Sequence, residues 1–227
     1  MKRTPLCVLS LDFREAFDRV AHRYLFAILK AYGLHDWFVD RIRHMYEVAA
    51  SSTQINGHFA GKIPLQCLVR QRCPLSMALF ALCINTLICY LDTHLKGVHL
   101  GRTGHRTAAV AYADDVTIFV TQCEDFWVLR DAIQHYEKAS GARLNVQKSK
   151  ALAVGGCTGT ENELGVDCVS NVRILGIAFS NTIDGEAHNS IPSTEDRNFP
   201  VPMVWSNLSG TSDHTTEAQA ARRMGLT

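Results

Sequence analysis

The sequence lacks the marks of several protein classes. None of its eight cysteines stands in a CxxC pair, and they are scattered from Cys7 to Cys168. This usage is typical of reduced thiols inside a cell and argues against a disulfide framework. The ten histidines show no zinc-ligand spacing, and no glycine-rich phosphate loop is present. Structural zinc, ATPase and dinucleotide chemistry therefore have no support in the sequence.

Long apolar runs are also missing. The longest, residues 77–91, is shorter than the roughly 18–20 residues of a bilayer span, so it predicts a buried helix. Only a short apolar stretch lies between the basic start and Asp12, so we expect no secretory signal. We expect an intracellular protein, nuclear or cytoplasmic, with no transmembrane segment and no membrane partner.

The composition itself suits a globular domain. The chain has 227 residues, of which 47% are hydrophobic and 20% are charged, enough for a core of ordinary size. Residues 1–150 carry 19 basic against 13 acidic side chains, whereas residues 151–227 carry 4 against 9. A basic body is compatible with a polyanionic partner, although an excess this small is also ordinary for a solvated surface.

Segments of different hydrophobic period alternate before residue 180. Strands are predicted at Leu6–Leu11, 109–113, 116–121, 151–154 and 172–179, with a hairpin over 53–69. Helices are predicted at 25–32, 37–46, 74–91 and 126–136, the last ended by Gly141. This order predicts an α+β fold in which helices pack on one face of an antiparallel sheet.

Residues 180–227 differ in composition from the rest. Of these 48 residues, 25 are Ser, Thr, Asn, Asp, Gly or Pro, so the segment has too little apolar surface to offset its ordering entropy. We therefore expect two regions: a folded domain over residues 1–179 and a polar, disordered tail over residues 180–227, with at most a short helix near 217–224.

Three aspartates lie at the ends of predicted strands. Asp12 follows the run Leu6–Leu11, and Asp114 and Asp115 occupy the link between the next two strands. Adjacent carboxylates repel and make a poor hairpin turn, so a divalent cation held by oxygen ligands is a natural partner. A solvated turn is the alternative for an isolated Asp-Asp pair. Three carboxylates in one place would suit phosphoryl transfer with two metal ions.

The aspartates belong to a series of five motif-like segments along the chain. They are residues 11–20 (LDFREAFDRV), 69–76 (VRQRCPLS), 111–116 (AYADDV), 140–150 (SGARLNVQKSK) and 174–177 (ILGI). The series resembles the palm motifs of reverse transcriptases from non-LTR (LINE-type) retrotransposons. The resemblance covers roughly residues 6–179 and implies a polymerase-like palm.

The resemblance implies a catalytic set. Asp12, Asp114 and Asp115 would bind two Mg²⁺ ions, or Mn²⁺, together with the backbone carbonyl of Phe13. Lys148 would lie near the triphosphate, where an ammonium could stabilise or protonate the departing pyrophosphate.

It also implies a substrate-binding set. Phe17 would be a steric gate whose ring leaves no room for a 2′-hydroxyl; without the motif it would be read as a core phenylalanine. Gln71 would lie between nucleotide and template, and Arg70 would contact phosphate. Tyr112 is expected near the primer terminus, and residues 175–176 would form the hairpin that grips the primer strand.

Two features depart from that family. Glycine normally stands at the positions of Leu68 and Arg72, where it lets backbone approach the nucleotide and template. We expect the Arg72 side chain to obstruct that pocket, though it could instead swing out and bind phosphate. The resemblance places the fingers before Asp12 and the thumb after Phe179, and neither is identified in the sequence. We therefore expect a truncated copy with weak or no processive synthesis.

The prediction is an RNA-directed DNA polymerase that adds deoxynucleotides, from deoxynucleoside triphosphates, to a DNA primer 3′-hydroxyl on an RNA template; the sequence leaves protein partners open. One alternative is a catalytically inactive, nucleic-acid-binding remnant of such an element. The run after Asp12 fits the LINE type better than an intron-encoded maturase or a telomerase-type enzyme. An unrelated α+β domain, the last alternative, would lack a pocket shared by Asp12 and Asp114.

Overall fold

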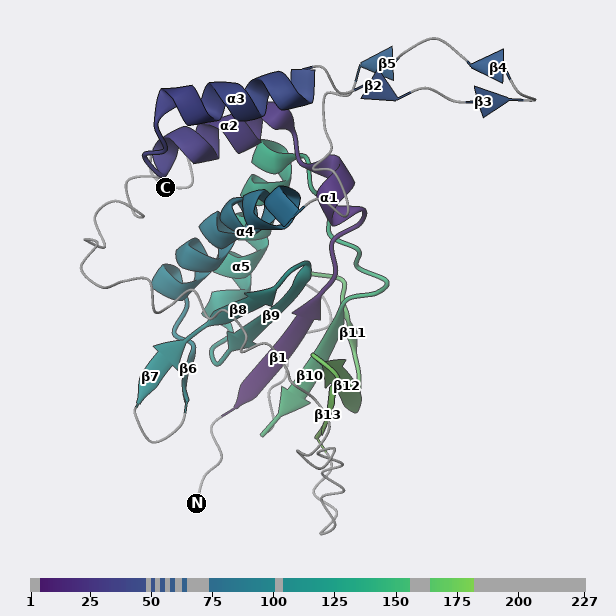
Figure 1. Cartoon of the computed structure of the whole chain (residues 1–227). Coiled ribbons are helices and arrows are strands. Elements are labelled where there is room, and N and C mark those ends of the chain that lie inside the picture. The colour runs from purple at the N-terminus through teal and green to yellow at the C-terminus, as the bar shows by residue number, and fades with distance from the viewer. Residues whose placement is uncertain are drawn as a thin grey trace, which may run out of the picture.

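A computed structural model of the chain describes residues 5–47, 74–100, 104–155 and 164–181, with four two-residue strands between residues 50 and 64 (Figure 1). Residues 182–227 of the tail predicted over 180–227 lie outside the described residues. So does the segment 65–73, which contains Leu68, Arg70, Gln71 and Arg72.

A five-stranded sheet forms the base of the molecule. Its strands lie in the order β11-β10-β1-β9-β8, with β1 in the centre. They span Leu6–Leu11 (β1), Ala109–Tyr112 (β8), Asp115–Val120 (β9), Lys150–Val154 (β10) and Asp167–Cys168 (β11). The antiparallel sheet is confirmed for β10, β1, β9 and β8, while β11 pairs parallel with β10 at one edge.

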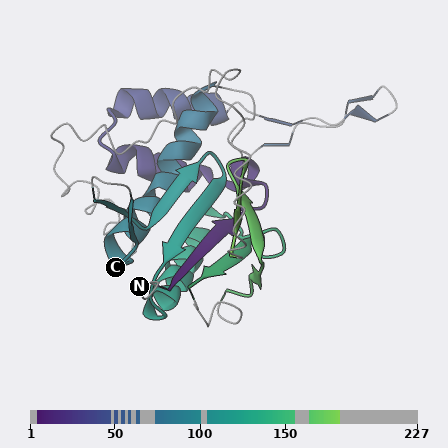
Figure 2. The ribbon, with the colours of Figure 1, turned by 90° about the horizontal axis from the view of Figure 1, so that it is seen from below.

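Helices gather on one side of this sheet, as Figures 1 and 2 show. They span Ala16–Arg19 (α1), His22–Ala31 (α2), Asp36–Glu47 (α3), Pro74–His94 (α4) and Glu124–Ser140 (α5). Helix α4 contacts β8 and α5, and α2 packs against α3, α4 and α5. The predicted arrangement of helices on one face is therefore confirmed.

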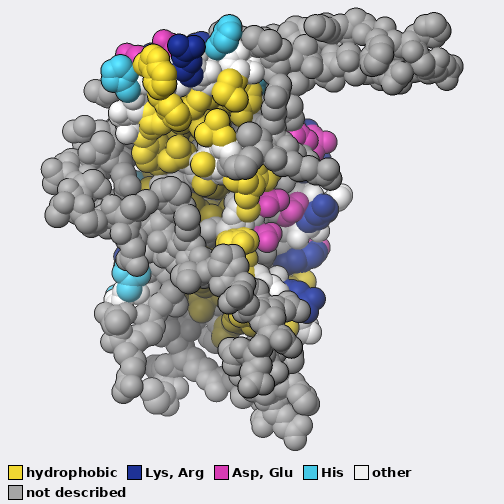
Figure 3. All heavy atoms as spheres, viewed as in Figure 1, with side chains coloured by type: hydrophobic (Ala, Val, Ile, Leu, Met, Phe, Trp, Pro, Cys, Tyr) yellow, Lys and Arg dark blue, Asp and Glu magenta, His cyan; other side chains and the backbone are white. Residues whose placement is uncertain are grey.

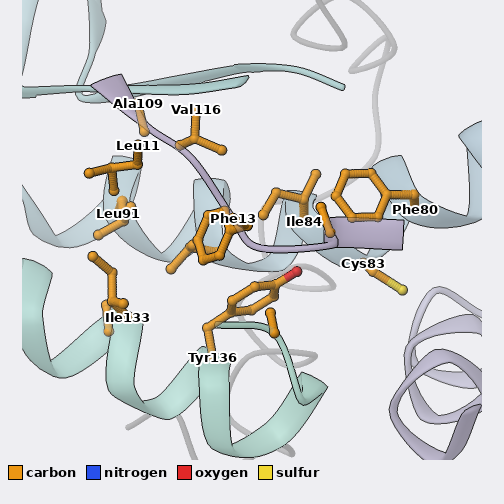
Figure 4. Packing of buried hydrophobic residues seen from close by; sticks show 14 of the residues in the cluster. Leu11, Phe13, Phe80, Cys83, Ile84, Leu91, Ala109, Val116, Ile133 and Tyr136 are labelled. Atoms are coloured by element: carbon orange, nitrogen blue, oxygen red, sulfur yellow. The ribbon is translucent and has the colours of Figure 1, made fainter. Parts of the chain in front are cut away.

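The core lies between the sheet and these helices. Along β1 every second residue is buried, namely Cys7, Leu9 and Leu11, because alternate side chains of a strand point to the same face. Figure 4 shows Leu11 pointing from the strand toward Leu91 of α4 and Ile133 of α5. The other side chains of β1 point to the opposite face of the sheet.

Helix α4 corrects one expectation. Its stretch Leu75–His94 is long and apolar enough, by length and composition, to cross a membrane, so the prediction that this segment is too short was wrong. The prediction of a buried helix holds, because Leu79, Phe80 and Leu87 are at most 2% exposed. A core helix of an α+β domain needs the same apolar composition.

Helix α3 buries fewer of its apolar residues than the periodicity predicts. Ile42 and Tyr46 are buried, whereas Trp37 and Met45 are 63% and 53% exposed. Arg41 lies over the Trp37 ring, 5.6 Å from its centroid, which covers part of this exposed surface.

Short two-stranded ribbons complete the described structure. Their strands are β2 (Ala50–Ser51), β3 (Gln54–Ile55), β4 (His58–Phe59), β5 (Ile63–Pro64), β6 (Val98–Leu100), β7 (His105–Thr107), β12 (Asn171–Ile174) and β13 (Ile177–Ser180). Of the hairpin predicted over 53–69, the pairing of β3 with β4 is present, whereas β5 pairs with β2 and residues 65–69 lie outside the described residues. The predicted strand 172–179 is two strands, β12 and β13, because Ile174 pairs with Ile177; the hairpin that the resemblance implied at residues 175–176 is present.

Candidate active site

Strand register brings two of the three aspartates together. The antiparallel pairing of β1 with β9 ends at Leu11 opposite Val116, so the next step places Asp12 opposite Asp115. Leu11 and Val116 are buried in the core, and alternation turns the residues beside them toward the other face. Both carboxylates therefore stand at one end of the central strand pair, on the open side of the sheet.

Asp114 lies in the turn next to them. Tyr112 pairs with Asp115, so the two-residue link of this hairpin is Ala113-Asp114. The predicted link, Asp114-Asp115, is thus wrong by one residue, because Asp115 is the first residue of β9. Ala113 is the turn residue with a left-handed backbone (φ +55°), a position that a small side chain tolerates best.

Left-handed backbone also occurs in other segments that carry the resemblance. Within the described ranges, the non-glycine residues with positive φ are Glu15, Ala113 and Leu175. Each belongs to one of the segments that carry the resemblance; Ala113 adjoins Asp114, and Glu15 lies three residues after Asp12. Such conformations cost of order 1–3 kcal/mol and persist where the surrounding structure imposes them.

A second segment runs along the chain that follows Asp12. Residues 140–149, here called the strap, lie beside residues 12–21. Main-chain bonds join them from Ala21 N–H to Ser140 O, from Arg14 N–H to Arg143 O and from Asn145 N–H to Asp12 O, each 2.8 Å long. The Ser149 hydroxyl also accepts the Asp12 N–H at 3.1 Å. The strap thereby places Lys148 beside Asp12.

These segments enclose a cleft of about 500 Å³. It is lined by Asp12, Phe13, Arg14, Glu15, Ala16, Phe17, Arg19, Asp114, Asn145 and Lys148. Acidic and basic side chains lie side by side on the flank of the molecule at the level of α1 and below it (Figure 3). A pocket shared by Asp12 and Asp114 is therefore present, which an unrelated α+β domain was expected to lack.

The carboxylates influence one another electrostatically. Partial burial raises the pKa of Asp115 above its ordinary value, and the charges of Asp114 and Asp12 raise it further. Like charges in one place disfavour ionisation, and a divalent cation would remove that penalty.

Phe17 fits both interpretations that the sequence left open. One side of its ring packs on Phe80 of the core, with centroids 4.4 Å apart, and the residue is half-buried. It also lines the cleft. A ring supported from behind by a buried aromatic is a rigid wall, which a steric gate needs.

The ring of Phe13 is buried, with its centroid 5.7 Å from that of Tyr136, so the predicted role of Phe13 would fall to its backbone. Phe13 forms a bridge with Leu144, and the two hydrogen bonds of that bridge use the Asp12 carbonyl and the Arg14 N–H. The Phe13 carbonyl takes no part in either bond.

The other predicted site residues differ in their position relative to the cleft. Lys148 is exposed and lines the cleft with Asp12. Tyr112 is 55% exposed at the end of β8, beside Asp115 and away from the cleft lining in the described residues. Arg70 and Gln71 fall in the segment that the structure does not describe, so their predicted roles stay predictions.

The donor set fits a divalent cation chemically, because carboxylate and carbonyl oxygens are the ligands that Mg²⁺ and Mn²⁺ prefer. Over the described ranges, however, no three His, Cys, Asp or Glu side chains are grouped so that they could hold one ion. The expected convergence on a common metal position is therefore not present in this arrangement. Asp114 and Asp115 are exposed, so a change of rotamer is open to them.

Sequence reasoning missed Arg14, Arg19, Asn145 and Ser149. Arg14 and Arg19 add positive charge to the cleft, and Asn145 and Ser149 bind the main chain of Asp12. Their nearness to Asp12 or Lys148 in the quoted motifs was the available signal.

Comparison with solved structures defines the fold. A telomerase from Candida tropicalis, truncated from its C-terminal domain, matches with a TM-score of 0.58 and 15% identity over 79% of this chain and 34% of that one. A telomerase from the same organism in complex with a TWJ fragment of telomeric RNA matches with a TM-score of 0.57, also at 15% identity, over 86% of this chain and 32% of that one. The likeness supports a palm-like polymerase fold.

The family follows from sequence. The model of the family "Reverse transcriptase (RNA-dependent DNA polymerase)" matches residues 2–179, and the chain belongs to this family. A 149 kDa protein of transposon TX1 from Xenopus laevis is 37% identical over 66% of this chain, and the Pol polyprotein of the retrotransposable element R2DM from Drosophila melanogaster is 30% identical over 66%. The chain covers only 12% and 14% of these relatives. The matched region is a reverse transcriptase domain of the non-LTR retrotransposon type.

Proposed function

We propose that this domain is an RNA-directed DNA polymerase that adds deoxynucleotides to a primer 3′-hydroxyl on an RNA template. The observation that carries the proposal is the shared cleft: strand register sets Asp12 opposite Asp115, the adjoining turn supplies Asp114, and the strap supplies Lys148. An RNA partner is also supported by the telomerase of this fold in complex with telomeric RNA.

The cleft residues divide the work by position. Asp12, Asp114, Asp115 and the Phe13 carbonyl would hold two Mg²⁺ or Mn²⁺ ions. When bound, such ions lower the pKa of the attacking hydroxyl and neutralise charge on the attacking and leaving oxygens. Lys148, on the strap, holds a proton where the pyrophosphate would depart.

Substrate selection belongs to the walls of the cleft. The Phe17 ring, held against Phe80, would exclude a ribose 2′-hydroxyl and so favour deoxynucleotides. Tyr112 would lie at the primer terminus, and Arg70 and Gln71 would contact phosphate and template. The exposed turn at Leu175-Gly176 of the β12–β13 hairpin would contact the primer strand.

The same proposal divides the chain into a palm domain over residues 1–179 and a separate polar tail over residues 180–227. It also places the protein inside the cell, in the nucleus or the cytoplasm, where RNA templates and deoxynucleoside triphosphates are found.

A catalytically inactive remnant that still binds nucleic acid is the second candidate. No three carboxylates of the described residues are grouped around one position, and Leu68 and Arg72 stand where the family has glycine. Binding of RNA that weakens with salt, without nucleotide incorporation, is its expected behaviour.

Single-nucleotide extension of a labelled DNA primer on an RNA template separates the two candidates. The full chain is assayed with Mg²⁺ and with Mn²⁺, beside the double variant Asp114→Asn/Asp115→Asn and the variant Arg72→Gly. Extension that is lost in the aspartate variant supports the polymerase. Extension by Arg72→Gly alone identifies a palm silenced by one side chain, and no extension by any of them supports the remnant.

A further inference from the structure

The main chain of Asp12 is held by the strap at both of its hydrogen-bonding groups. Its carbonyl accepts the Asn145 N–H at 2.8 Å, and its N–H donates to the Ser149 hydroxyl at 3.1 Å. The Ser149 hydroxyl in turn donates to the Asn145 carbonyl at 2.9 Å. Asp12, Asn145 and Ser149 thus form a closed network that spans 137 positions of sequence.

Strand register shows why a side chain is needed there. The pairing of β1 with β10 ends at Ser10 opposite Lys150, so continuation would bring Asp12 opposite Lys148. Residues 146–148 form a turn instead, and the Lys148 and Ser149 amides fold back onto the Asn145 carbonyl at 3.1 and 2.9 Å. The Asp12 N–H therefore meets a serine oxygen in the place of a ladder carbonyl.

Burial shields the hydrogen bond between Asp12 and Ser149 from water. Ser149 has no exposed surface, and Asn145 is 9% exposed. Water cannot readily replace a hydroxyl in such a position, and a buried N–H that loses its acceptor is unfavourable. The orientation of the Asp12 carboxylate follows from its backbone, because Asp12 lies one residue beyond the end of β1.

We propose that Ser149 is a positioning residue, which sets the backbone of Asp12 so that its carboxylate faces Asp115 across the sheet end. The proposal rests on the proposed function for its catalytic consequence. The same hydroxyl ties Asp12 to the turn that carries Lys148, so one side chain fixes the relative placement of both groups.

The strap offers a matched control. Ser140 is as buried as Ser149, and its hydroxyl also donates to the carbonyl four residues earlier, that of Tyr136, at 2.6 Å. It likewise accepts a main-chain N–H, from Ala142 at 3.1 Å. Ser140→Ala therefore removes a hydroxyl of the same kind without touching Asp12.

The test compares Ser149→Ala, Ser149→Thr and Ser140→Ala with the native full chain. Amide hydrogen exchange of Asp12 is followed by NMR, Mn²⁺ affinity is measured without nucleic acid, and kcat and KM are measured for single-nucleotide extension. In Ser149→Ala we expect the Asp12 amide to exchange faster, because it loses its acceptor. We expect the Mn²⁺ dissociation constant to rise about tenfold, in the range known for groups that orient metal ligands, and kcat to fall more than KM changes. Ser149→Thr, which keeps the hydroxyl, should stay within about threefold of native.

Several outcomes would overturn the proposal. One is unchanged Asp12 exchange in Ser149→Ala, and another is an equal loss of Mn²⁺ affinity in Ser140→Ala. If Ser149→Ala does not fold, Ser149→Cys takes its place under the same criteria, because a thiol fills the site and is a weak acceptor. If exchange and Mn²⁺ affinity change as expected while not even the native chain extends a primer, the positioning role stands and the polymerase proposal fails.

Discussion

Asp12 and the pair Asp114–Asp115 supply the same chemical group from two very different settings. Asp12 follows the central strand of the sheet, and the strap binds its main chain on both sides. Asp114 and Asp115 stand on a hairpin whose outer strand, β8, is the edge of the sheet, and both are exposed. The proposed metal site would therefore combine one carboxylate on a held backbone with two exposed, adaptable ones.

The two settings are anchored to the same core. The beginning of β8 is held by α4, because the Asp92 carboxylate accepts the N–H groups of Ala108 and Ala109 at 2.6 and 3.1 Å. The end of β8, at Tyr112, is exposed. The hairpin tip can therefore move without any change at the anchored end of β8. Movement of Asp12, in contrast, would break its main-chain hydrogen bonds to the strap.

Removal of the fixed carboxylate should have the largest effect. Asp12→Asn is expected to reduce primer extension by about 100-fold or more, because a metal ligand is lost that no flexible neighbour can replace. Circular dichroism should show an unchanged fold. Asp131→Asn, on the surface of α5, is the control and should extend at the native rate. Near-native extension by Asp12→Asn would contradict the role of the fixed ligand.

Substitution of Phe17, whose ring forms a wall of the cleft, should change the selection of the nucleotide sugar. Phe17→Ala is expected to raise ribonucleotide incorporation relative to deoxynucleotide incorporation by roughly tenfold, while lost packing on Phe80 lowers the free energy of unfolding by about 1–2 kcal/mol. Competition between the two nucleotides in single-turnover extension measures the ratio. Phe17→Tyr keeps the ring and should keep the selection; a change in stability alone would leave Phe17 as a core residue.

Substitution of two glycines compares the strap directly with an exposed hairpin. Gly141 (φ +83°) would place a Cβ 2.9 Å from the Arg19 carbonyl, whereas Gly176 (φ +84°) has open space. Gly141→Ala should lower the free energy of unfolding by about 2 kcal/mol and Gly176→Ala by about 1 kcal/mol, since only the first adds a steric clash to the backbone strain. Urea denaturation measures both. Equal losses in the free energy of unfolding would mean that the strap at Gly141 is no more closely packed than the hairpin at Gly176.

The smallest effect concerns pH. Because burial and then the charges of Asp114 and Asp12 raise the pKa of Asp115 in the folded protein, its contribution to stability is present below the ordinary value of 3.8 and is lost as pH rises through the raised pKa. Without metal, Asp115→Asn should therefore be slightly more stable than native at neutral pH and equal to it at low pH. Urea denaturation in chelator at several pH values tests this.

The control for that experiment is an NMR titration of Asp115. In Asp114→Asn the pKa of Asp115 should move down toward its ordinary value, because one of the repelling charges is gone. An unmoved pKa would mean that the hairpin carboxylate does not influence its neighbour.

Much of the fold was predictable because its longer elements bury regular faces. Strand β1 was predicted with its observed bounds, and α5 ends where Gly141 predicts it. The short elements α1, β6, β7 and β11 were not predicted. A run of two to four residues has too few side chains to show a period, and its conformation depends on the elements it contacts.

The candidate site divides in the same way. Asp12, Asp114, Asp115, Phe17 and Lys148 were identified from their motifs, and the structure brings them, with the exception of Asp115, to the lining of one cleft. The turn was misplaced by one residue, because the pairing of Tyr112 with Asp115 is a property of the sheet.

The sequence by itself determined the family, the α+β class and the residues of the proposed site, because hydrophobic period and motif composition are local properties of the chain. The tertiary structure decided which carboxylate is held and which are free to adapt. The main chain of Asp12 is bound by Asn145 and Ser149, residues far away in the sequence that only strand register and burial bring beside it.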